Sequence, residues 1–98
     1  MVKHLKNWGL DEQEVKKIAD EELKRKGLRE VELSLVFVGK KKARGLNQRY
    51  RKMDYVPEVL AFQMDNEILG DIVVCIDKLK SEKQLREWIR HGIVNLLQ

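Results

Sequence analysis

The sequence has little of several residue types that would define its class at once. It contains one cysteine, one proline and six glycines among 98 residues. A single cysteine cannot form an internal disulfide, so the chain is not a disulfide-stabilised domain. The scarcity of proline and glycine argues against fibrous and low-complexity chains. With 43% hydrophobic and 37% charged residues, the composition is that of a globular domain.

Long apolar runs are also absent. Runs such as 72–76 are far shorter than the roughly 20 residues that span a bilayer as a helix. The first residues lack the apolar stretch and small-residue cleavage site of a secretory signal. We therefore expect a cytoplasmic protein. Cys75 lies inside the apolar run, which indicates a buried, unreactive thiol.

Common signatures of catalysis are missing as well. The sequence has no phosphate-binding glycine loop, no Ser-His-Asp signature and no obvious pair of catalytic carboxylates. Its length leaves room for one domain, which we expect to occupy residues 1–98, and excludes a two-domain enzyme.

Positive charge is concentrated in one segment. The net charge is +4, and residues 39–52 carry +7 without any acid, so the remainder carries 4 − 7 = −3. Such a concentration is typical of a phosphate-binding surface, and Tyr50 offers a ring on which a base can stack. Charge alone leaves a solvated, lysine-rich helix equally open. The basic segment, as it is called below, comprises Lys40, Lys41, Lys42, Arg44, Arg49, Arg51 and Lys52.

Two capping boxes predict where long helices begin. Asp11 is followed three residues later by Glu14, and apolar residues recur at helical spacing over 11–26. Ser81 and Gln84 form the second box, ahead of an apolar stripe that continues to the end of the chain. Because the first helix is amphipathic, we expect it to pack on a sheet.

Three strands and a short helix are predicted between these long helices. Residues 31–38 alternate and then become apolar on both faces, which favours a strand in the middle of a sheet. A basic helix over 41–51 follows, and strands over 59–64 and 68–76 are joined by a hairpin turn at 65–67. The predicted order is α-β-α-β-β-α, with one β-α-β crossover around the basic helix and one antiparallel hairpin. The sequence therefore predicts a single α+β domain with a small mixed sheet packed against helices.

Three polar residues are candidates for a site. His91 and Asn95 are four residues apart in the last predicted helix, so they project from the same face. Zinc usually needs at least three protein ligands, and nothing in the sequence brings His4 near, so His91 taken alone is more typical of a structural histidine. Asp71 places a charge inside an apolar strand, where we expect a backbone amide or an arginine to bind it.

Four short segments match, in order, the motifs of one known family. They read LNQRYR at 46–51, DYVPEVLAF at 54–62, LGDIVVC at 69–75 and HGIV at 91–94. They resemble L-N-x-x-Y-R, D-K-P-T-D-V-L-S-F, L-G-D-I-V-I-C and the start of H-G-x-L-H-L-L-G-x-D-H in the YbeY family. Members of that family are bacterial rRNA maturation factors, described as metal-dependent single-strand endoribonucleases.

The resemblance implies a zinc site built from the three histidines of the last motif. His91 matches the first histidine, Asn95 stands in place of the second, and the sequence ends at Gln98, before the third. An amide is a poor substitute for imidazole on zinc. The chain is thus similar to a degenerate or a truncated member of the family, and we expect zinc to be weakly bound or absent and the endoribonuclease activity to be weakened or lost. A non-catalytic RNA-binding or ribosome-binding module remains the alternative.

The resemblance also implies a role for Arg51, because the matching arginine of the family is taken to be essential for activity on RNA. Arg51 lies in the basic segment, and its planar guanidinium suits bidentate contact with a phosphate. A salt bridge to Asp71 or Glu58 is the structural alternative. We predict Arg51 and His91 as catalytic residues, and the basic segment as the surface that binds ribosomal RNA or a ribosomal particle.

Overall fold

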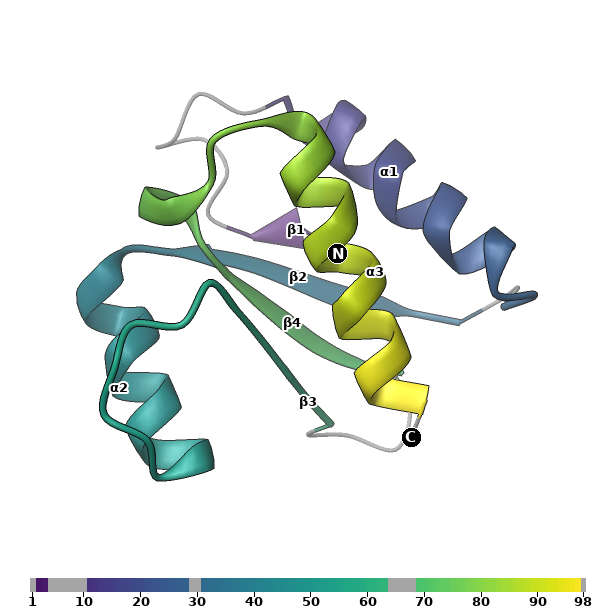
Figure 1. The fold of residues 1–98 in the computed structure, drawn as a ribbon. Coiled ribbons are helices and arrows are strands. Elements are labelled where there is room, and N and C mark those ends of the chain that lie inside the picture. The colour runs from purple at the N-terminus through teal and green to yellow at the C-terminus, as the bar shows by residue number, and fades with distance from the viewer. Residues whose placement is uncertain (1, 4–10, 29–30, 64–68, 98) are drawn as a thin grey trace.

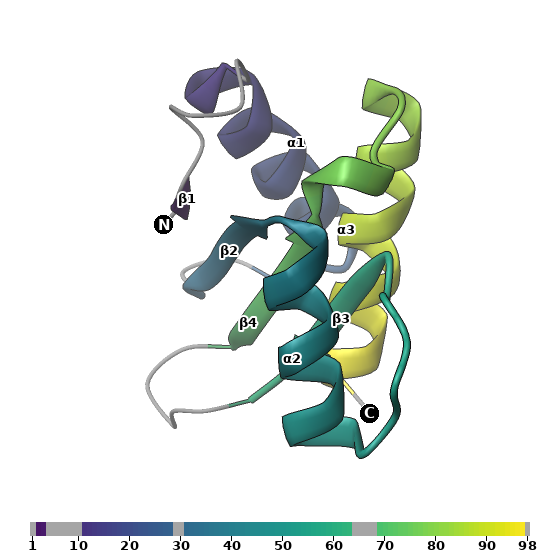
Figure 2. The ribbon, with the colours of Figure 1, turned by 90° about the vertical axis from the view of Figure 1, so that its left-hand side faces the viewer.

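The computed structural model describes residues 2–3, 11–28, 31–63 and 69–97. Its elements form three layers, with two helices on one face of a mixed sheet and one helix on the other (Figures 1 and 2). In chain order they are β1 (Val2–Lys3), α1 (Glu12–Arg25), β2 (Leu33–Val38), α2 (Lys40–Arg51), β3 (Val59–Phe62), β4 (Gly70–Cys75), the short 3-10 helix η2 (Ile76–Lys78) and α3 (Glu82–Leu97). The predicted α+β class and the order of the predicted elements are confirmed.

The sheet has the strand order β1-β2-β4-β3. β2 pairs with β4 in parallel. β3 pairs with β4 in the antiparallel direction, from Val59 opposite Val74 to Phe62 opposite Asp71, which confirms the predicted pairing of the hairpin strands. The predicted turn at 65–67 lies outside the described residues.

Two features of the sheet differ from the prediction. β2 precedes α2 in the sequence and β3 follows it, but in the sheet the two strands run in opposite directions and β4 lies between them. The predicted β-α-β crossover around the basic helix is therefore wrong. The β-α-β unit is β1-α1-β2, whose strands are parallel neighbours. β1 was missed because two residues are too few to show a periodic pattern.

Apolar side chains pack on both faces of the sheet. Leu35 and Ile72 belong to the core cluster shared with α1 and α3. Val38 and Val73 belong to a second cluster, with Ala43 of α2. Successive residues of a strand point to opposite faces, so a strand covered on both sides is apolar at nearly every position. This explains why β2 and β4 contain few polar residues.

Capping residues fix the ends of the long helices. Oδ1 of Asp11 accepts a hydrogen bond from the backbone N of Gln13 at 2.9 Å. Oγ of Ser81 accepts one from the backbone N of Gln84 at 3.1 Å. Each cap satisfies a donor that has no partner inside its helix, and the predicted starts of both helices are confirmed. Gly27 follows α1 with a φ of 72°, a left-handed conformation that glycine adopts without strain.

A buried carboxylate joins α1 to α3. The side chain of Glu22 is 1% exposed, and its Oε1 accepts hydrogen bonds from Nε and Nη2 of Arg90 at 3.1 and 2.7 Å. These bonds raise the pKa of Arg90. An unpaired carboxylate here would be costly, so Arg90 makes the burial of Glu22 tolerable and restricts how the two helices pack.

Cys75 is a free thiol with 1% of its surface exposed, as predicted. Among the described residues, no helix combines the length and apolar content needed to cross a membrane.

Two glycines in helices are predicted to respond oppositely to substitution by alanine. A Cβ at Gly92 would lie 2.5 Å from Cδ1 of Ile72, which is fully buried, so Gly92→Ala is expected to destabilise the fold by about 1–3 kcal/mol. A Cβ at Gly45 would meet nothing within 4 Å, so Gly45→Ala is expected to stabilise the fold by up to about 1 kcal/mol. Urea denaturation followed by circular dichroism measures both changes. Equal effects of the two substitutions would contradict the packing described for α3.

Candidate nucleic-acid interface

The basic segment forms the solvent-facing surface of α2 and of Lys52, which caps it. All seven of its cationic residues are exposed. At helical spacing, one face of α2 is turned inward and carries Ala43 and Asn47, which are 1% and 0% exposed. The cations occupy the remaining faces, so folding leaves the predicted concentration of charge on the surface.

The N-terminus of α2 is held by a residue that is distant in the sequence. Gly39 supplies no capping side chain, and the first turn contains lysines but no acid, which the helix dipole disfavours. Oδ2 of Asp77, in η2, accepts a hydrogen bond from the backbone N of Lys40 at 2.9 Å. This remote carboxylate therefore satisfies the helix end that the local sequence leaves without a cap.

The C-terminal end of α2 is tied to the loop that follows it. Nδ2 of the buried Asn47 donates to the backbone O of Tyr55 at 3.1 Å. Nζ of Lys78 donates to the backbone O of Val56 at 2.8 Å from the side of η2. Nη1 of Arg51 donates to the hydroxyl of Tyr55 at 3.3 Å. Arg51 is therefore placed by a loop that is itself fixed to the helix and to η2.

Aromatic rings lie beside these cations. The ring of Tyr50, predicted as a stacking surface, packs on the ring of Phe62 with centroids 4.6 Å apart and planes 16° apart. Tyr50 remains 43% exposed and Tyr55 49% exposed. The guanidinium of Arg49 lies 5.7 Å from the centre of the Tyr50 ring. Exposed rings next to cations are the combination used to bind single-stranded nucleic acids.

One cation of the basic segment is neutralised by an acid. Nε of Arg44 and Oδ1 of Asp54 are 2.6 Å apart, and both side chains are more than half exposed. The hydrogen bond from Arg44 lowers the pKa of Asp54, and the same bond raises the pKa of Arg44. Arg51 makes no ion pair with any described residue, so the alternative of a salt bridge to Asp71 or Glu58 is not realised there. Arg51 is left available for a phosphate.

The surroundings of Asp71 differ from those predicted, in which a backbone amide or an arginine binds its carboxylate. Its side chain is half-buried, and it has no hydrogen bond or ion pair with any residue that the structure describes. Its strand neighbours are Ser34 and Phe62, which offer no cation. Partial exposure to solvent explains how the carboxylate is tolerated without the predicted partner.

The second predicted catalytic residue lies in another layer. His91 and Asn95 are both exposed on α3, as their spacing predicts. α3 and α2 cover opposite faces of the sheet (Figure 2), and no contact joins His91 to Arg51 in the described part of the chain.

The described residues do not fit a zinc ion. His91 supplies one imidazole, and no group of three histidine, cysteine, aspartate or glutamate side chains that could hold a metal occurs within 2–3, 11–28, 31–63 and 69–97. Asn95 adds only an amide oxygen. Because zinc in proteins usually has at least three protein ligands, no chemical step is assigned to it in this structure.

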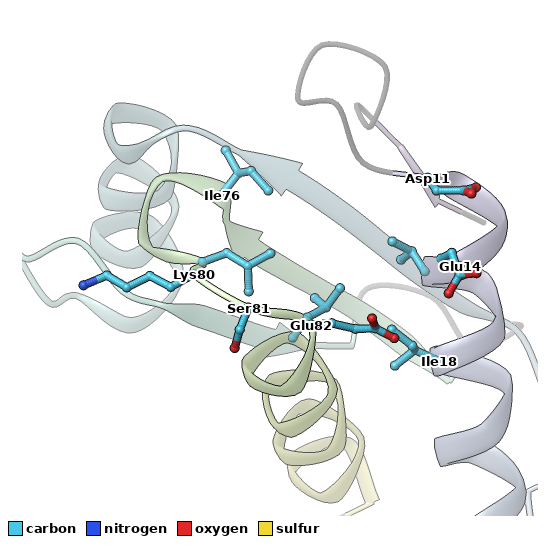
Figure 3. Close-up of a pocket in the computed structure, with 10 residues that line it drawn as sticks. Asp11, Glu14, Ile18, Ile76, Lys80, Ser81 and Glu82 are labelled. Atoms are coloured by element: carbon cyan, nitrogen blue, oxygen red, sulfur yellow. The ribbon is translucent and has the colours of Figure 1, made fainter.

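A cavity of about 550 Å³ lies between the first turns of α1 and α3, and none of its lining residues belongs to the basic segment (Figure 3). Its lining is partly apolar, and the charged residues in it are three acids and one lysine: Asp11, Glu14, Glu82 and Lys80. Carboxylates repel phosphates, so this cavity is a poor site for RNA. The candidate interface is therefore the surface of α2.

Sequence reasoning found the cations and Tyr50 but missed the residues that hold them in place. Asn47 was part of a recognised motif, and its helical position next to the buried face was the signal that could have found it. Asp77 and Tyr55 act through contacts with α2 that no local pattern encodes.

Comparison with known proteins identifies the family. A family model described as "Endoribonuclease YbeY" matches residues 3–96. A relative named Endoribonuclease YbeY from Aquifex aeolicus is 35% identical over 95% of this chain and 71% of its own length. A relative of the same name from Bdellovibrio bacteriovorus is 35% identical over 78% of this chain and 61% of its own length. Another, from Finegoldia magna, is 36% identical over 67% of this chain and 48% of its own length. A solution structure from Thermotoga maritima covers 90% of this chain and 60% of its own, at 25% identity and a TM-score of 0.47. The chain belongs to the YbeY family, as its motifs suggested.

The ion pair at the edge of the interface predicts how Asp54 titrates. Its pKa lies below the ordinary value because Arg44 donates to it, so the pair persists at pH values above that lowered pKa and is lost as the pH falls through it. In Arg44→Gln the pKa of Asp54 is expected to rise toward its ordinary value. Carboxyl carbon shifts in an NMR titration measure this change, with the exposed Asp20 of α1 as the reference. An unchanged Asp54 titration in the variant would contradict the pairing.

Proposed function

We propose that this chain acts on RNA as a YbeY-type rRNA-processing protein and binds the RNA through the basic segment on α2. The observation that carries the proposal is the clustering of seven exposed cations, with Tyr50 and Tyr55, on one helix and its following loop. Membership of the YbeY family supports the same conclusion independently, because the similar proteins are named endoribonucleases.

In this proposal Arg51 binds a backbone phosphate. Its guanidinium has planar donors that match phosphate oxygens. The hydrogen bond to Tyr55 already restricts the orientation of the Arg51 side chain, so less conformational entropy is lost when it binds a phosphate. Arg44 is already paired with Asp54, so it contributes less to phosphate binding than the other cations of the basic segment. Tyr50 and Tyr55 supply stacking surfaces for unpaired bases, and ribosomal RNA or a ribosomal particle is the proposed partner.

We also propose that hydrolysis by this chain is weak or absent, with zinc weakly bound or not bound. Support comes from the donor set on α3, where His91 stands with Asn95 and without two further strong ligands among the described residues. His91 would take part in metal binding only if other donors completed the site. A non-catalytic RNA-binding module is the second candidate, favoured by the separation of Arg51 from His91 by the sheet.

RNA binding is predicted to depend strongly on salt and on Arg51. If about five cations contact phosphates of a single strand, log affinity should fall with log salt at a slope of roughly −3 to −5. Arg51→Ala is expected to weaken binding about tenfold at low salt, and Arg51→Lys should recover only part of the loss because lysine lacks the planar fork. Fluorescence anisotropy with a labelled single-stranded oligonucleotide measures both effects.

The control for charge alone is Lys83→Ala, which removes an exposed cation from α3 on the other face of the sheet. Its affinity should stay within about twofold of the unmodified chain, as expected for a cation that makes no phosphate contact. A flat salt response, or equal losses for Arg51→Ala and Lys83→Ala, would leave the basic segment as a solubilising face.

Metal content and cleavage test the proposed chemistry. The purified chain is expected to contain far less than one zinc per molecule and to cleave single-stranded RNA at a rate that His91→Ala does not change. Elemental analysis and a gel assay of a labelled oligonucleotide measure these quantities, with Glu87→Ala as an exposed control on α3. One zinc per chain, together with cleavage that is lost in His91→Ala and kept in Glu87→Ala, would overturn the proposal of lost activity.

A further inference from the structure

Three side chains form a row across the face of the sheet that α2 covers in part. Ser34 in β2 and Phe62 in β3 are the Cα partners of Asp71 in β4, one on each side. Val73 lies two residues after Asp71 on the same face, and it packs in the core cluster that contains Ala43 of α2. The row is therefore on the side of the sheet that carries the basic segment.

Two polar groups in this row have no partner within the part of the chain that the structure describes. The Asp71 carboxylate is half-buried and makes no hydrogen bond or ion pair with any described residue. Ser34 is 7% exposed, and its Oγ is buried without a hydrogen-bond partner in residues 2–3, 11–28, 31–63 and 69–97. Buried polar groups in native proteins are nearly always paired, so the covered Ser34 hydroxyl is an exception. The half-buried Asp71 carboxylate is in contact with solvent, which the hydrogen-bond donors of a ligand can replace.

An aromatic wall connects the row to the basic segment. Phe62, next to Asp71, stacks on Tyr50 of α2, and Arg49 lies against the Tyr50 ring. A nucleotide whose phosphate is held on α2 would thus have an apolar ring pair beside it and a carboxylate beyond the rings. The negative charge of Asp71 repels phosphate, so it directs a base toward the row and leaves the backbone with the cations.

We infer that this row is a subsite that recognises guanine in the RNA bound by α2, an inference that rests on the proposed function. A carboxylate can only accept hydrogen bonds. Guanine presents two adjacent donors on its Watson–Crick edge, the N1–H and the 2-amino group, so it can bind both oxygens of Asp71. Adenine and cytosine present a donor beside an acceptor there, and uracil presents one donor between two acceptors, so each would place an acceptor against the carboxylate.

Ser34 is a positioning residue in this subsite. Its Oγ is covered and cannot reach the base, but neighbouring strands lie only about 4.8 Å apart, so its hydroxyl can donate to the adjacent carboxylate and orient it. Phe62 and Tyr50 bound the subsite on the other side. Asp71 contacts the base directly and determines the specificity.

The test compares oligouridine strands that differ in one central nucleotide. Fluorescence anisotropy at fixed salt should show about tenfold tighter binding of the strand with guanosine than of strands with uridine or adenosine, as expected for one bidentate base contact. The strand with inosine, which lacks the 2-amino group, should bind several-fold more weakly than the guanosine strand. Asp71→Asn should reduce the preference for guanosine to about twofold or less, while its affinity for the all-uridine strand stays equal or rises because the repulsion of phosphate is removed.

Two further variants separate recognition from folding. Ser34→Ala should lower the preference for guanosine by a smaller factor than Asp71→Asn does. Asp20→Asn makes the same chemical change at an exposed position of α1, on the opposite face, and should leave the preference unchanged. If Asp71→Asn fails to fold by circular dichroism, the inosine comparison in the unmodified chain still decides, since it needs no variant.

The outcomes distinguish this inference from the proposed function. If none of the oligonucleotides shows salt-dependent binding, the proposed function is overturned, and the inference with it. Salt-dependent binding with equal affinity for guanosine, inosine and uridine would overturn the guanine subsite alone. An Asp71→Asn variant that keeps the full preference for guanosine would also overturn it, because the discrimination would then arise elsewhere.

Discussion

The parallel pairing of β2 with β4 in the middle of the sheet is the constraint on which the other elements depend. Helices cover both faces of these strands, so nearly every residue of β2 and β4 faces an apolar layer. A polar residue in either strand is therefore conspicuous. The two exceptions with chemically useful side chains, Ser34 and Asp71, are cross-strand neighbours, and both lie on the side of α2. These two polar groups, which have no partner among the residues that the structure describes, therefore lie next to the cationic helix.

The basic helix is possible because tertiary contacts compensate for an unfavourable local sequence. Lysines in the first turn oppose the helix dipole, and seven cations within a short segment repel one another. Ala43 fixes the helix on the sheet, Asp77 satisfies its first turn, and Asn47 binds the following loop. Packing rather than local propensity therefore stabilises α2, and these contacts set the orientation of the charges before any ligand binds.

Local patterns were sufficient for the long helices and for the hairpin strands. Asp11 and Ser81 act as caps within a few residues of their partners, so the sequence displays the interaction directly. The β1 strand, the Asp77 cap and the Glu22–Arg90 pair could not be predicted in this way. Each joins segments that are distant in sequence, or spans too few residues to show a period. The basic segment was visible in composition, but which of its cations is neutralised depended on the path of the loop that brings Asp54 to Arg44.

The same topology separates the basic segment from the residue that the motif associates with metal. Arg51 belongs to the layer formed by α2, whereas His91 is exposed on α3, and the sheet lies between the two helices. α3 packs through Trp88, Ile89 and Ile93, which are 6%, 0% and 0% exposed. His91 adds nothing to that contact because it faces solvent. A substitution on the exposed face of α3 is therefore not expected to alter the packing of α2. The basic segment and His91 are therefore maintained by different side chains in different layers, so one of the two features can change without the other.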